Sequence, residues 1–381
     1  MSGYLKIVGS SGILVSSQTK GEMMSTNYNN YCAIKQGLKS RYPIELKGNN
    51  ERQLNTLSLI IAGIVFSQKT SIPAIVRKVP DKTILASRIR KIERWLDNRR
   101  ITSEIYYLPF LIALLNRLPD LLMMIIDGSN IGRNCAVLSI NVVYKKRALP
   151  LCWLVVSGGK GHFSEASHIE LAKMLAEILP KERKVVFLGD GEFDGVELLE
   201  TLSGFGWYYV CRTAVNVVLW EEGERFSPKD LFLEPGEPIE FLDVQMTKAK
   251  YGPVLVSIIW EEPWTSPLIL ISNLDLLEEA WYFYRYRFRI ETFFSDQKSR
   301  GFYLCHSHLS NPEHLSRLFM ACCLAYLWMV FLGDMVKQSG WVHHIHRRGR
   351  CDLSLFQIGL RWIDYCLNEN KPLIETFWVD I

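Results

Sequence analysis

Residues 121–212 carry the pattern that most constrains this fold: three strand-like apolar runs in succession, followed by alternating helical and strand-like segments. Residues 121–126 form an uninterrupted apolar run, which is typical of a buried strand closed by a turn where it meets Asp-Gly. Two further strands are predicted at residues 135–144 and 148–156, and the short basic link between them indicates a hairpin.

The second part of this segment alternates between two kinds of element. Amphipathic helices are predicted at residues 165–178 and 196–203, and strands at residues 184–188 and 207–212. The order is therefore β-β-β-α-β-α-β. Three antiparallel strands followed by such an alternation is the order of a ribonuclease-H-like core, a mixed sheet with helices on its faces.

Composition divides the rest of the chain. Residues 1–110 are expected to form a basic helical DNA-binding domain, and the core is expected to comprise residues 111–213 and 275–336. The intervening residues 214–274 contain short apolar runs and many acidic side chains, so a β-rich insertion is predicted there. Residues 337–381 are predicted to be a C-terminal helical region. The predicted fold class is α/β, with helical segments on either side of the core.

Charge is unevenly distributed along the chain. Residues 1–100 carry 17 basic and 6 acidic side chains, a net charge of +11, whereas residues 101–381 carry 27 basic and 34 acidic side chains. Such asymmetry favours contact with a polyanion and says nothing about fold. A helix predicted over residues 84–96, with Thr83 as its N-cap, presents the candidate DNA contacts, which are Arg88, Arg90, Lys91 and Arg94. The alternative is the solvated charged face of a structural helix.

Cysteine usage and apolar run lengths indicate the compartment. Nine cysteines without regular spacing favour a reducing environment, so a cytoplasmic location is expected. The apolar run at residues 12–15 is too short for a secretory signal. The longest apolar run, residues 318–332, is shorter than the roughly 18 to 20 residues that a membrane span needs, so a buried helix is predicted.

Two aspartates share one sequence context. Asp127 and Asp190 each follow an apolar strand and precede a glycine. If the two strands are central neighbours, both carboxylates project from the same end of the sheet, where open α/β sheets form their sites. Each Asp-Gly pair alone is also an ordinary turn, so a third acid is needed to distinguish the two interpretations.

A third acid lies in a helix predicted over residues 276–300. Along this helix Tyr284, Arg287, Glu291 and Lys298 would project within an arc of roughly 60°, at about 100° per residue. The alternative is a solvated face with an intrahelical ion pair between Arg287 and Glu291. That alternative does not explain the aromatic residues interleaved with this polar line.

The spacing of these four residues resembles the YREK signature of a known family. In bacterial transposases of insertion sequence family 4, two residues separate the tyrosine from the arginine, three separate the arginine from the glutamate, and six separate the glutamate from the lysine. The resemblance of this chain to that family extends over roughly residues 80–335. It implies a DDE transposase whose ribonuclease-H-like core is interrupted by a β insertion. It further implies a catalytic and metal-binding triad of Asp127, Asp190 and Glu291, with DNA backbone contacts from Tyr284, Arg287 and Lys298.

The chain departs from this family after the second acid. An arginine is frequent at that position in the family, whereas here Gly191 follows Asp190. Any contact made by the arginine is therefore in doubt, and Glu192 and Asp194 remain weaker candidates for the acid role.

The implied chemistry accounts for the residue types. In-line displacement at phosphorus is assisted by two Mg²⁺ ions about 3.5 to 4 Å apart, with Mn²⁺ as a substitute, and three carboxylates with the substrate phosphate suffice to hold them. Arg287 offers a bidentate fork to phosphate and Lys298 a point charge, while Tyr284 could donate a hydrogen bond or stack on a displaced base.

The implied activity is cut-and-paste DNA transposition in a prokaryotic cytoplasm. The expected partners are double-stranded DNA, namely the terminal inverted repeats of an insertion sequence and a target, and a second copy of the chain in the synaptic complex, with no membrane. The alternatives are a nuclease of the same fold without strand transfer, and a non-catalytic DNA-binding derivative.

A basic patch lies near the C-terminus, and it is interpreted as an exposed loop and a further candidate DNA contact. Its members are His343, His344, His346, Arg347, Arg348 and Arg350.

Overall fold

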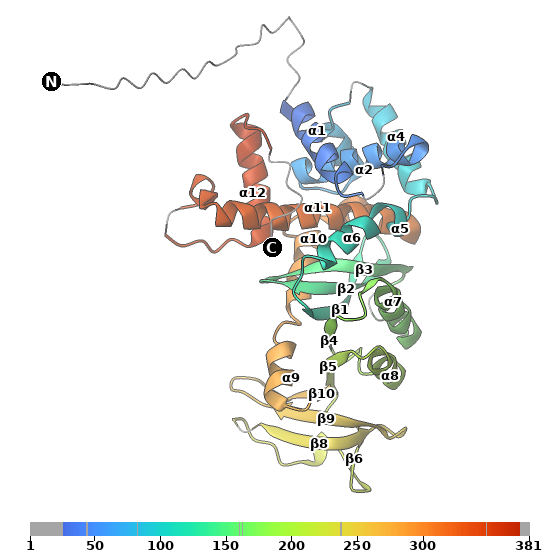
Figure 1. The fold of residues 1–381 in the computed structure, drawn as a ribbon, viewed down its shortest axis with the longest axis vertical. Coiled ribbons are helices and arrows are strands. Elements are labelled where there is room, and N and C mark those ends of the chain that lie inside the picture. Colours follow the sequence, from blue (N-terminus) through green and yellow to red (C-terminus); the bar gives the residue numbers. More distant parts are fainter. Residues whose placement is uncertain are drawn as a thin grey trace, which may run out of the picture.

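The computed structural model describes most of the chain. The described residues are 26–42, 45–81, 83–159, 161, 163–236, 238–347 and 349–373. The expectations for residues 1–25 and for Arg348 lie outside them. Figure 1 shows a helical end at the top, a long sheet below it, and the insertion at the bottom.

Six helices precede the sheet. They are α1 (Thr26–Lys39), α2 (Gly48–Ser67), α3 (Ile72–Lys78), α4 (Leu85–Asp97), α5 (Ser103–Tyr106) and α6 (Leu108–Leu115). The second half of α2 is apolar and buried on all sides. It packs closely on α3 at Gly63, where a Cβ atom would lie only 2.5 Å from Ile75 Cγ2.

Helix α4 differs in part from the prediction. Ile92, Trp95 and Leu96 are buried as its amphipathic spacing requires. The N-cap is Ile84 without a side-chain hydrogen bond, so the prediction of Thr83 as the cap was wrong. The side chain of Ile84 is 74% exposed because α4 begins beyond the edge of the bundle core.

Ten strands form one mixed sheet in the order β3-β2-β1-β4-β5-β10-β9-β8-β6-β7. Their bounds are β1 (Leu121–Ile131), β2 (Cys135–Tyr144), β3 (Arg147–Ser157), β4 (Lys184–Gly189), β5 (Tyr208–Thr213), β6 (Leu219–Glu221), β7 (Glu224–Phe226), β8 (Ile239–Met246), β9 (Tyr251–Ile259) and β10 (Leu268–Ser272).

The first five strands have the predicted order. β1, β2 and β3 are antiparallel neighbours, while β4 pairs parallel with β1 and β5 parallel with β4. One detail was wrong, because β1 does not end at Asp127. It continues to Ile131, since Asp127 and the four residues after it stay paired with β2.

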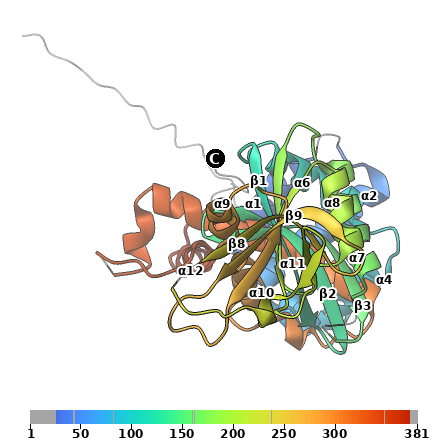
Figure 2. The ribbon, with the colours of Figure 1, turned by 90° about the horizontal axis from the view of Figure 1, so that it is seen from below.

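Helices cover both faces of these strands. α7 (Glu165–Ile178) and α8 (Val196–Gly204) lie on one face, and α9 (Leu277–Tyr284) and α10 (Arg289–Lys298) on the other (Figures 1 and 2). Adjacent residues of β3 illustrate the division. Cys152 contacts Leu171 of α7, whereas Trp153 donates to Ser316 of α11 (Pro312–Gln338). The sheet is therefore covered on both sides even at its edge strand, β3.

The insertion contributes to the same sheet. Strands β6 to β10 fall within residues 214–274, and β10 pairs antiparallel with β5. Figure 2 shows these strands continuing the twist of the central sheet. Residues 214–274 therefore lengthen the sheet on the side of β5.

The predicted helix over residues 276–300 is broken. Helix α9 ends at Tyr284 and α10 begins at Arg289. Between them the amide of Arg287 donates to Tyr284 and that of Ile290 to Arg287, each over three residues. This tighter winding changes the direction of the side chains, so the single helix face expected for Tyr284 to Lys298 does not exist in this form.

The last two long helices complete the helical end. α11 is buried over most of its length and packs against α12 (Leu355–Asn368). By length and composition α11 could cross a membrane, and so could α2 and α3 if counted as one bent span, but 94% of the apolar window of α11 is buried inside the protein. This is the buried helix that the sequence predicts.

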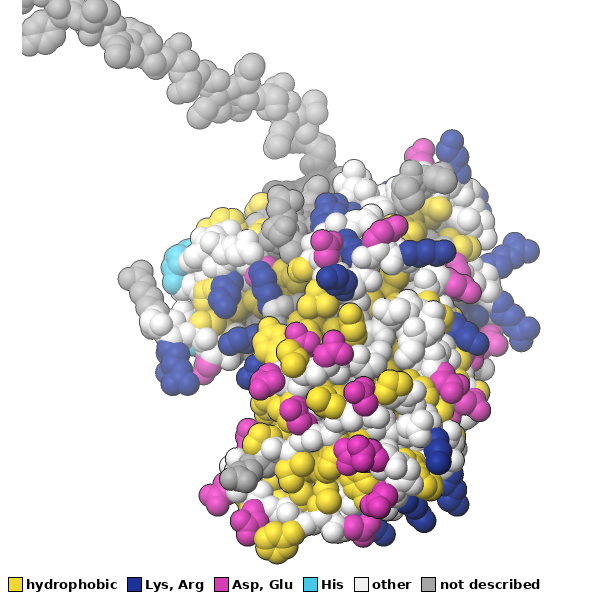
Figure 3. Space-filling model, turned by 60° about the horizontal axis from the view of Figure 1, so that its bottom comes forward, with side chains coloured by type: hydrophobic (Ala, Val, Ile, Leu, Met, Phe, Trp, Pro, Cys, Tyr) yellow, Lys and Arg dark blue, Asp and Glu magenta, His cyan; other side chains and the backbone are white. Residues whose placement is uncertain are grey.

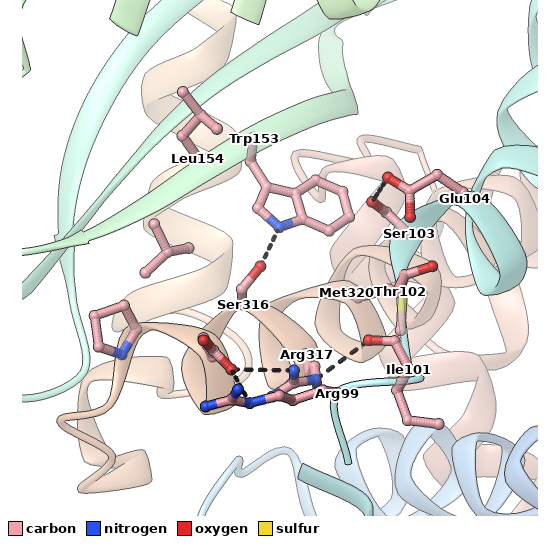
Figure 4. Close-up of a pocket in the computed structure, with 13 residues that line it drawn as sticks. Arg99, Ile101, Thr102, Ser103, Glu104, Trp153, Leu154, Ser316, Arg317 and Met320 are labelled. Atoms are coloured by element: carbon pink, nitrogen blue, oxygen red, sulfur yellow. Dashed lines mark hydrogen bonds and ion pairs between the residues drawn. The ribbon is translucent and has the colours of Figure 1, made fainter. Parts of the chain in front are cut away.

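Arg317 of α11 joins the N-terminal helices to the core. Its guanidinium donates to the carbonyls of Leu96 and Ile101 at 2.7 and 3.2 Å, and lies 3.3 Å from Glu313. Figure 4 shows the contact between Arg317 and Ile101 at the edge of a hollow of about 390 Å³ between α5, β3 and α11. The contacts fix the end of α4 relative to the sheet.

Candidate active site

Strand register places Asp127 and Asp190 at the same height. Ile125 of β1 pairs with Leu188 of β4, and the two aspartates lie two residues further along their parallel strands. Because side chains alternate along a strand, both aspartates project on the same face as that pair. They lie at the carboxyl end of β4, the position where α/β sheets bind ligands.

Three carboxylates meet at this position. Oxygens of Asp127, Asp190 and Glu192 all lie within 4.8 Å of one another. Asp127 is buried, Asp190 is half-buried and Glu192 is exposed. Among the described residues, this is the group of acidic, histidine or cysteine side chains that could hold a metal ion.

The loop after β4 has a defined conformation. The carboxylate of Asp190 accepts from the amide of Glu192 at 3.1 Å, and its carbonyl accepts from the amide of Phe193 at 3.0 Å. The buried Phe193 ring packs against Gly189, where a Cβ atom would lie 2.6 Å from Phe193 Cβ. This glycine therefore allows the loop to fold back under Asp190.

Asp194 has a structural role. Its Oδ2 accepts from Thr213 Oγ1 of β5 at 2.6 Å. Burial raises the pKa of this carboxyl, and the Thr213 hydrogen bond opposes the rise. Asp194 is not in the three-carboxylate group, so of the two weaker candidates the structure brings Glu192, and not Asp194, to the first two acids.

Glu291 lies outside that group. Its side chain is 54% exposed, and Oε1 is 2.9 Å from Arg287 Nη2. This is the intrahelical ion pair that the alternative interpretation predicted. The structure therefore brings together two members of the expected triad, with Glu192 beside them and Glu291 held by Arg287.

Tyr284 and Arg287 line the same region. The guanidinium carbon of Arg287 is 5.9 Å from the centre of the Tyr284 ring. Burial raises the pKa of Tyr284 to about 12, so the phenol is neutral at physiological pH and can donate a hydrogen bond. Only 2% of the residue is exposed, and the expected stacking on a base has no free ring face.

Arg287 is a buried arginine beside an exposed aromatic ring. Only 8% of the residue is exposed, and its guanidinium carbon is 4.3 Å from the centre of the Phe288 ring. Its Nε atom is buried without a hydrogen-bond partner. Phe288 itself is 52% exposed. An unsatisfied donor on a buried cation is a suitable contact for an incoming phosphate.

Arg212 was not anticipated from the sequence. It lies two residues after Val210 of β5, which pairs with Leu188 of β4, so it follows Asp190 in the same row across the sheet. Its side chain is exposed. The sequence feature that could have identified Arg212 is a basic residue at the end of the third parallel strand. The strand pattern alone did not indicate that this residue is functional.

Two further residues were missed because only tertiary packing reveals them. Glu165 of α7 accepts from the amide of Leu198 at 3.0 Å and so caps the start of α8. The His168 ring lies 4.6 Å from the Phe193 ring, and burial lowers its pKa. Both side chains support the loop that carries Asp190 and Glu192.

The remaining predicted DNA contacts differ in exposure and in their bonding partners. Lys298 ends α10 and is half-buried. On α4, Arg90 and Arg94 are exposed, while Lys91 is 3.6 Å from Asp81. Arg88 donates to three backbone carbonyls, those of Val76, Val79 and Thr83. Arg88 thus closes the end of α3. Of the two exposed arginines, Arg90 lies 3.3 Å from Glu93, and Arg94 donates to the carbonyl of Arg90.

The donor set of the carboxylate group suits a hard cation. All three side chains offer oxygen, and neither nitrogen nor sulfur ligands belong to the group. Mg²⁺ and Mn²⁺ prefer such ligands and retain waters, so the exposed side of the group leaves room for a substrate oxygen.

The family of the chain was identified by comparison with known proteins. A family model described as "Transposase DDE domain" matches residues 124–328, which is 205 of the 381 residues. Among solved structures, the chain is similar to a cryo-EM structure of the piggyBac transposase synaptic complex with hairpin DNA, with 10% identity over 91% of this chain and 79% of that chain and a TM-score of 0.47. No curated protein matches the chain.

Proposed function

The chain belongs to the transposase DDE domain family, and from this premise we propose that it catalyses cut-and-paste transposition of an insertion sequence of family 4. It would bind the terminal inverted repeats of the element, cleave the DNA at the element ends, and join those ends to a target. The observation that carries this proposal is the pair Asp127 and Asp190, which project at one height from neighbouring parallel strands.

The reaction consists of two displacements at phosphorus. In the first, water attacks the scissile phosphate, the bond to the 3′-oxygen breaks, and a 3′-hydroxyl is released. In the second, that hydroxyl attacks a target phosphate, a new phosphodiester bond forms, and the displaced target oxygen takes the proton. A divalent cation held by the carboxylates would supply charge neutralisation for the attacking and leaving oxygens.

The side chains of this site have separate tasks. Asp127 and Asp190 would hold the cation as anionic oxygen ligands from a rigid sheet, with Glu291 as the third acid of the family arrangement. The neutral phenol of Tyr284 would donate to a phosphate oxygen, and Arg287 would pair with the DNA backbone once it releases Glu291. Lys298 would add a point charge further along α10.

DNA binding would begin at the N-terminal helices. Arg90 and Arg94 extend from one side of α4 into solvent, and the net charge of the first hundred residues favours a polyanion. Lys91 would contribute in part, since Asp81 already lies near it. Two chains would cooperate to hold two element ends, in the prokaryotic cytoplasm where the element resides.

A joining assay tests the proposal. The purified chain is incubated with Mg²⁺, a duplex carrying the DNA that flanks its reading frame, and a supercoiled target plasmid. We expect the 3′ end of the duplex to become covalently attached to the plasmid. Cleavage without attachment would instead indicate a nuclease, and binding without cleavage a non-catalytic derivative, and either result would overturn the proposal.

A further inference from the structure

A second cationic surface lies at the C-terminal end of the chain, outside the site described above. It is formed by Arg347, Arg350 and Arg361, which we call the C-terminal basic face. All three side chains are exposed, and that of Arg347 is 69% exposed. They come from the segment between α11 and α12 and from α12 itself.

The three arginines border one concave surface. A hollow of about 370 Å³ has Arg347 and Arg350 on its wall, and a second hollow of about 660 Å³ has Arg347 and Arg361. Arg347 therefore lies between the two hollows and joins them. Figure 3 shows Lys and Arg side chains at the left of the molecule, where this lobe projects, whereas Asp and Glu predominate over the lower part.

The nearby acids leave this face positive. Asp352 lies 3.1 Å from His346 and 4.0 Å from Arg347, which among the described residues is the one of the three arginines that this carboxylate approaches. Asp364, the acid within α12, instead accepts from Gln68 at the end of α2 at 3.0 Å. A concave surface with excess guanidinium charge is complementary to a row of phosphates.

The face is mounted on a rigid support. Helices α11 and α12 approach so closely that a Cβ atom at Gly333 would strike the backbone of Leu355, and one at Gly359 that of Met329. Ser354 and Gln357 form a capping box at the start of α12. These contacts fix the backbone of α12, which carries Arg361, while Arg347 and Arg350 lie in the segment that leads into it.

We propose that the C-terminal basic face binds the sugar-phosphate backbone of the target duplex without reading its sequence. The planar guanidinium pairs with phosphate oxygens in a bidentate way, and a surface of arginines alone carries no base-reading pattern. Figure 1 shows α12 and α4 on opposite sides of the helical end, so this face and α4 can contact different DNA segments. The proposal rests on the proposed function, which requires a target duplex beside the element end.

A salt titration of DNA binding tests the proposal. The full chain and a variant carrying Arg347→Gln, Arg350→Gln and Arg361→Gln are titrated onto a labelled duplex of unrelated sequence over a series of KCl concentrations. We expect the slope of log affinity against log salt to become shallower by about 2 to 3, at about 0.9 per lost phosphate contact. The corresponding triple lysine variant should keep most of the slope, because backbone attraction is electrostatic.

A matched control separates this face from general surface charge. Arg225 of β7 is also exposed but lies among acidic residues of the insertion, so Arg225→Gln should leave the slope unchanged. Unchanged circular dichroism and Tm would show that each variant is folded. A triple glutamine variant with the wild-type slope, or an equal change in the Arg225 variant, would overturn the proposal.

The joining assay distinguishes this proposal from the proposed function. In one outcome the wild-type chain never joins ends, while DNA binding by the triple glutamine variant still depends less on salt than that of the wild type. That result would overturn the proposed function alone. A triple glutamine variant that cleaves element ends normally but joins them poorly to target would support the basic face. One that joins them at the wild-type rate would overturn it.

Discussion

At the scale of residues, the site is a row of charged side chains across adjacent parallel strands. Strands β1, β4 and β5 contain one row of paired residues. Two positions further along the chain from each of these residues lie Asp127, Asp190 and Arg212, respectively. Their positions depend on backbone register, which is fixed by many hydrogen bonds, and not on side-chain contacts. A sheet of this kind supplies the rigidity that a catalytic group requires.

Glu192 and Glu291 are expected to have different roles. Glu192 lies with the first two acids, whereas Glu291 is paired with Arg287. We predict that Glu291→Gln lowers the rate of end cleavage at least 100-fold at any Mg²⁺ concentration, and that Glu192→Gln raises the Mg²⁺ concentration for half-maximal cleavage about 10 to 100-fold. Rates measured against Mg²⁺ concentration check both expectations.

Glutamine is the matched substitution in both cases, because it keeps the size and the accepting oxygen of the side chain. The reverse pattern, with Glu192→Gln inactive and Glu291→Gln merely weakened in metal affinity, would assign the third acid to Glu192.

At the scale of elements, α10 depends on a buried ion pair. Arg147 of β3 lies 2.8 Å from Asp296 of α10, and their side chains are 12% and 6% exposed. The helix also carries Glu291 and Lys298. The pair therefore fixes the side of the sheet on which these two residues lie.

This ion pair predicts a pH dependence of stability. Burial raises the pKa of Asp296 to about 6, although Arg147 opposes the rise. The folded protein then holds this proton more tightly than the unfolded chain does. The contribution of Asp296 to the free energy of unfolding is therefore greatest below about pH 4 and falls as the pH rises through about 6.

The variant Asp296→Asn isolates this contribution, because asparagine does not titrate. In urea unfolding, the stability of the wild-type protein relative to the variant should fall by roughly 2 to 3 kcal/mol between pH 4 and pH 7. A difference that stays constant with pH would contradict the assigned pKa.

The elements also show what sequence patterns can predict. The order of the first five strands and the buried character of α11 followed from apolar periodicity, because both depend on local spacing. The continuation of β1 past Asp127 depends on pairing with β2, and the extension of the sheet by the insertion depends on pairing between β10 and β5. Such pairing has no local signal.

The candidate site was predictable to a similar extent. Asp127 and Asp190 were identified from strand ends, and their common height was expected from the strand order. The break between α9 and α10 was not predicted, because it arises from how the chain packs after Tyr284. Glu192 was predicted only as a weaker candidate for the acid role, and the loop after β4 brings it to the first two acids. Arg88 also appeared to be a DNA contact, but it is occupied by backbone carbonyls.

At the scale of the whole molecule, the near-neutral total charge conceals a division of the surface. The helical end carries exposed arginines on α4 and on the C-terminal basic face, while Figure 3 shows acidic side chains over the lower part of the molecule. DNA would therefore contact the helical end and the central site, and avoid the far end of the insertion.

The most direct test of the central claim separates chemistry from binding in one variant. Asp190→Ala removes one of the two aspartates that project at the same height from β1 and β4, without touching α4. Cleavage of an inverted-repeat duplex in Mg²⁺ and binding of the same duplex are measured in parallel for this variant and the wild-type protein. We predict that cleavage is abolished while binding stays within about twofold of wild type. Full cleavage by the Asp190→Ala variant would contradict the assignment of this site.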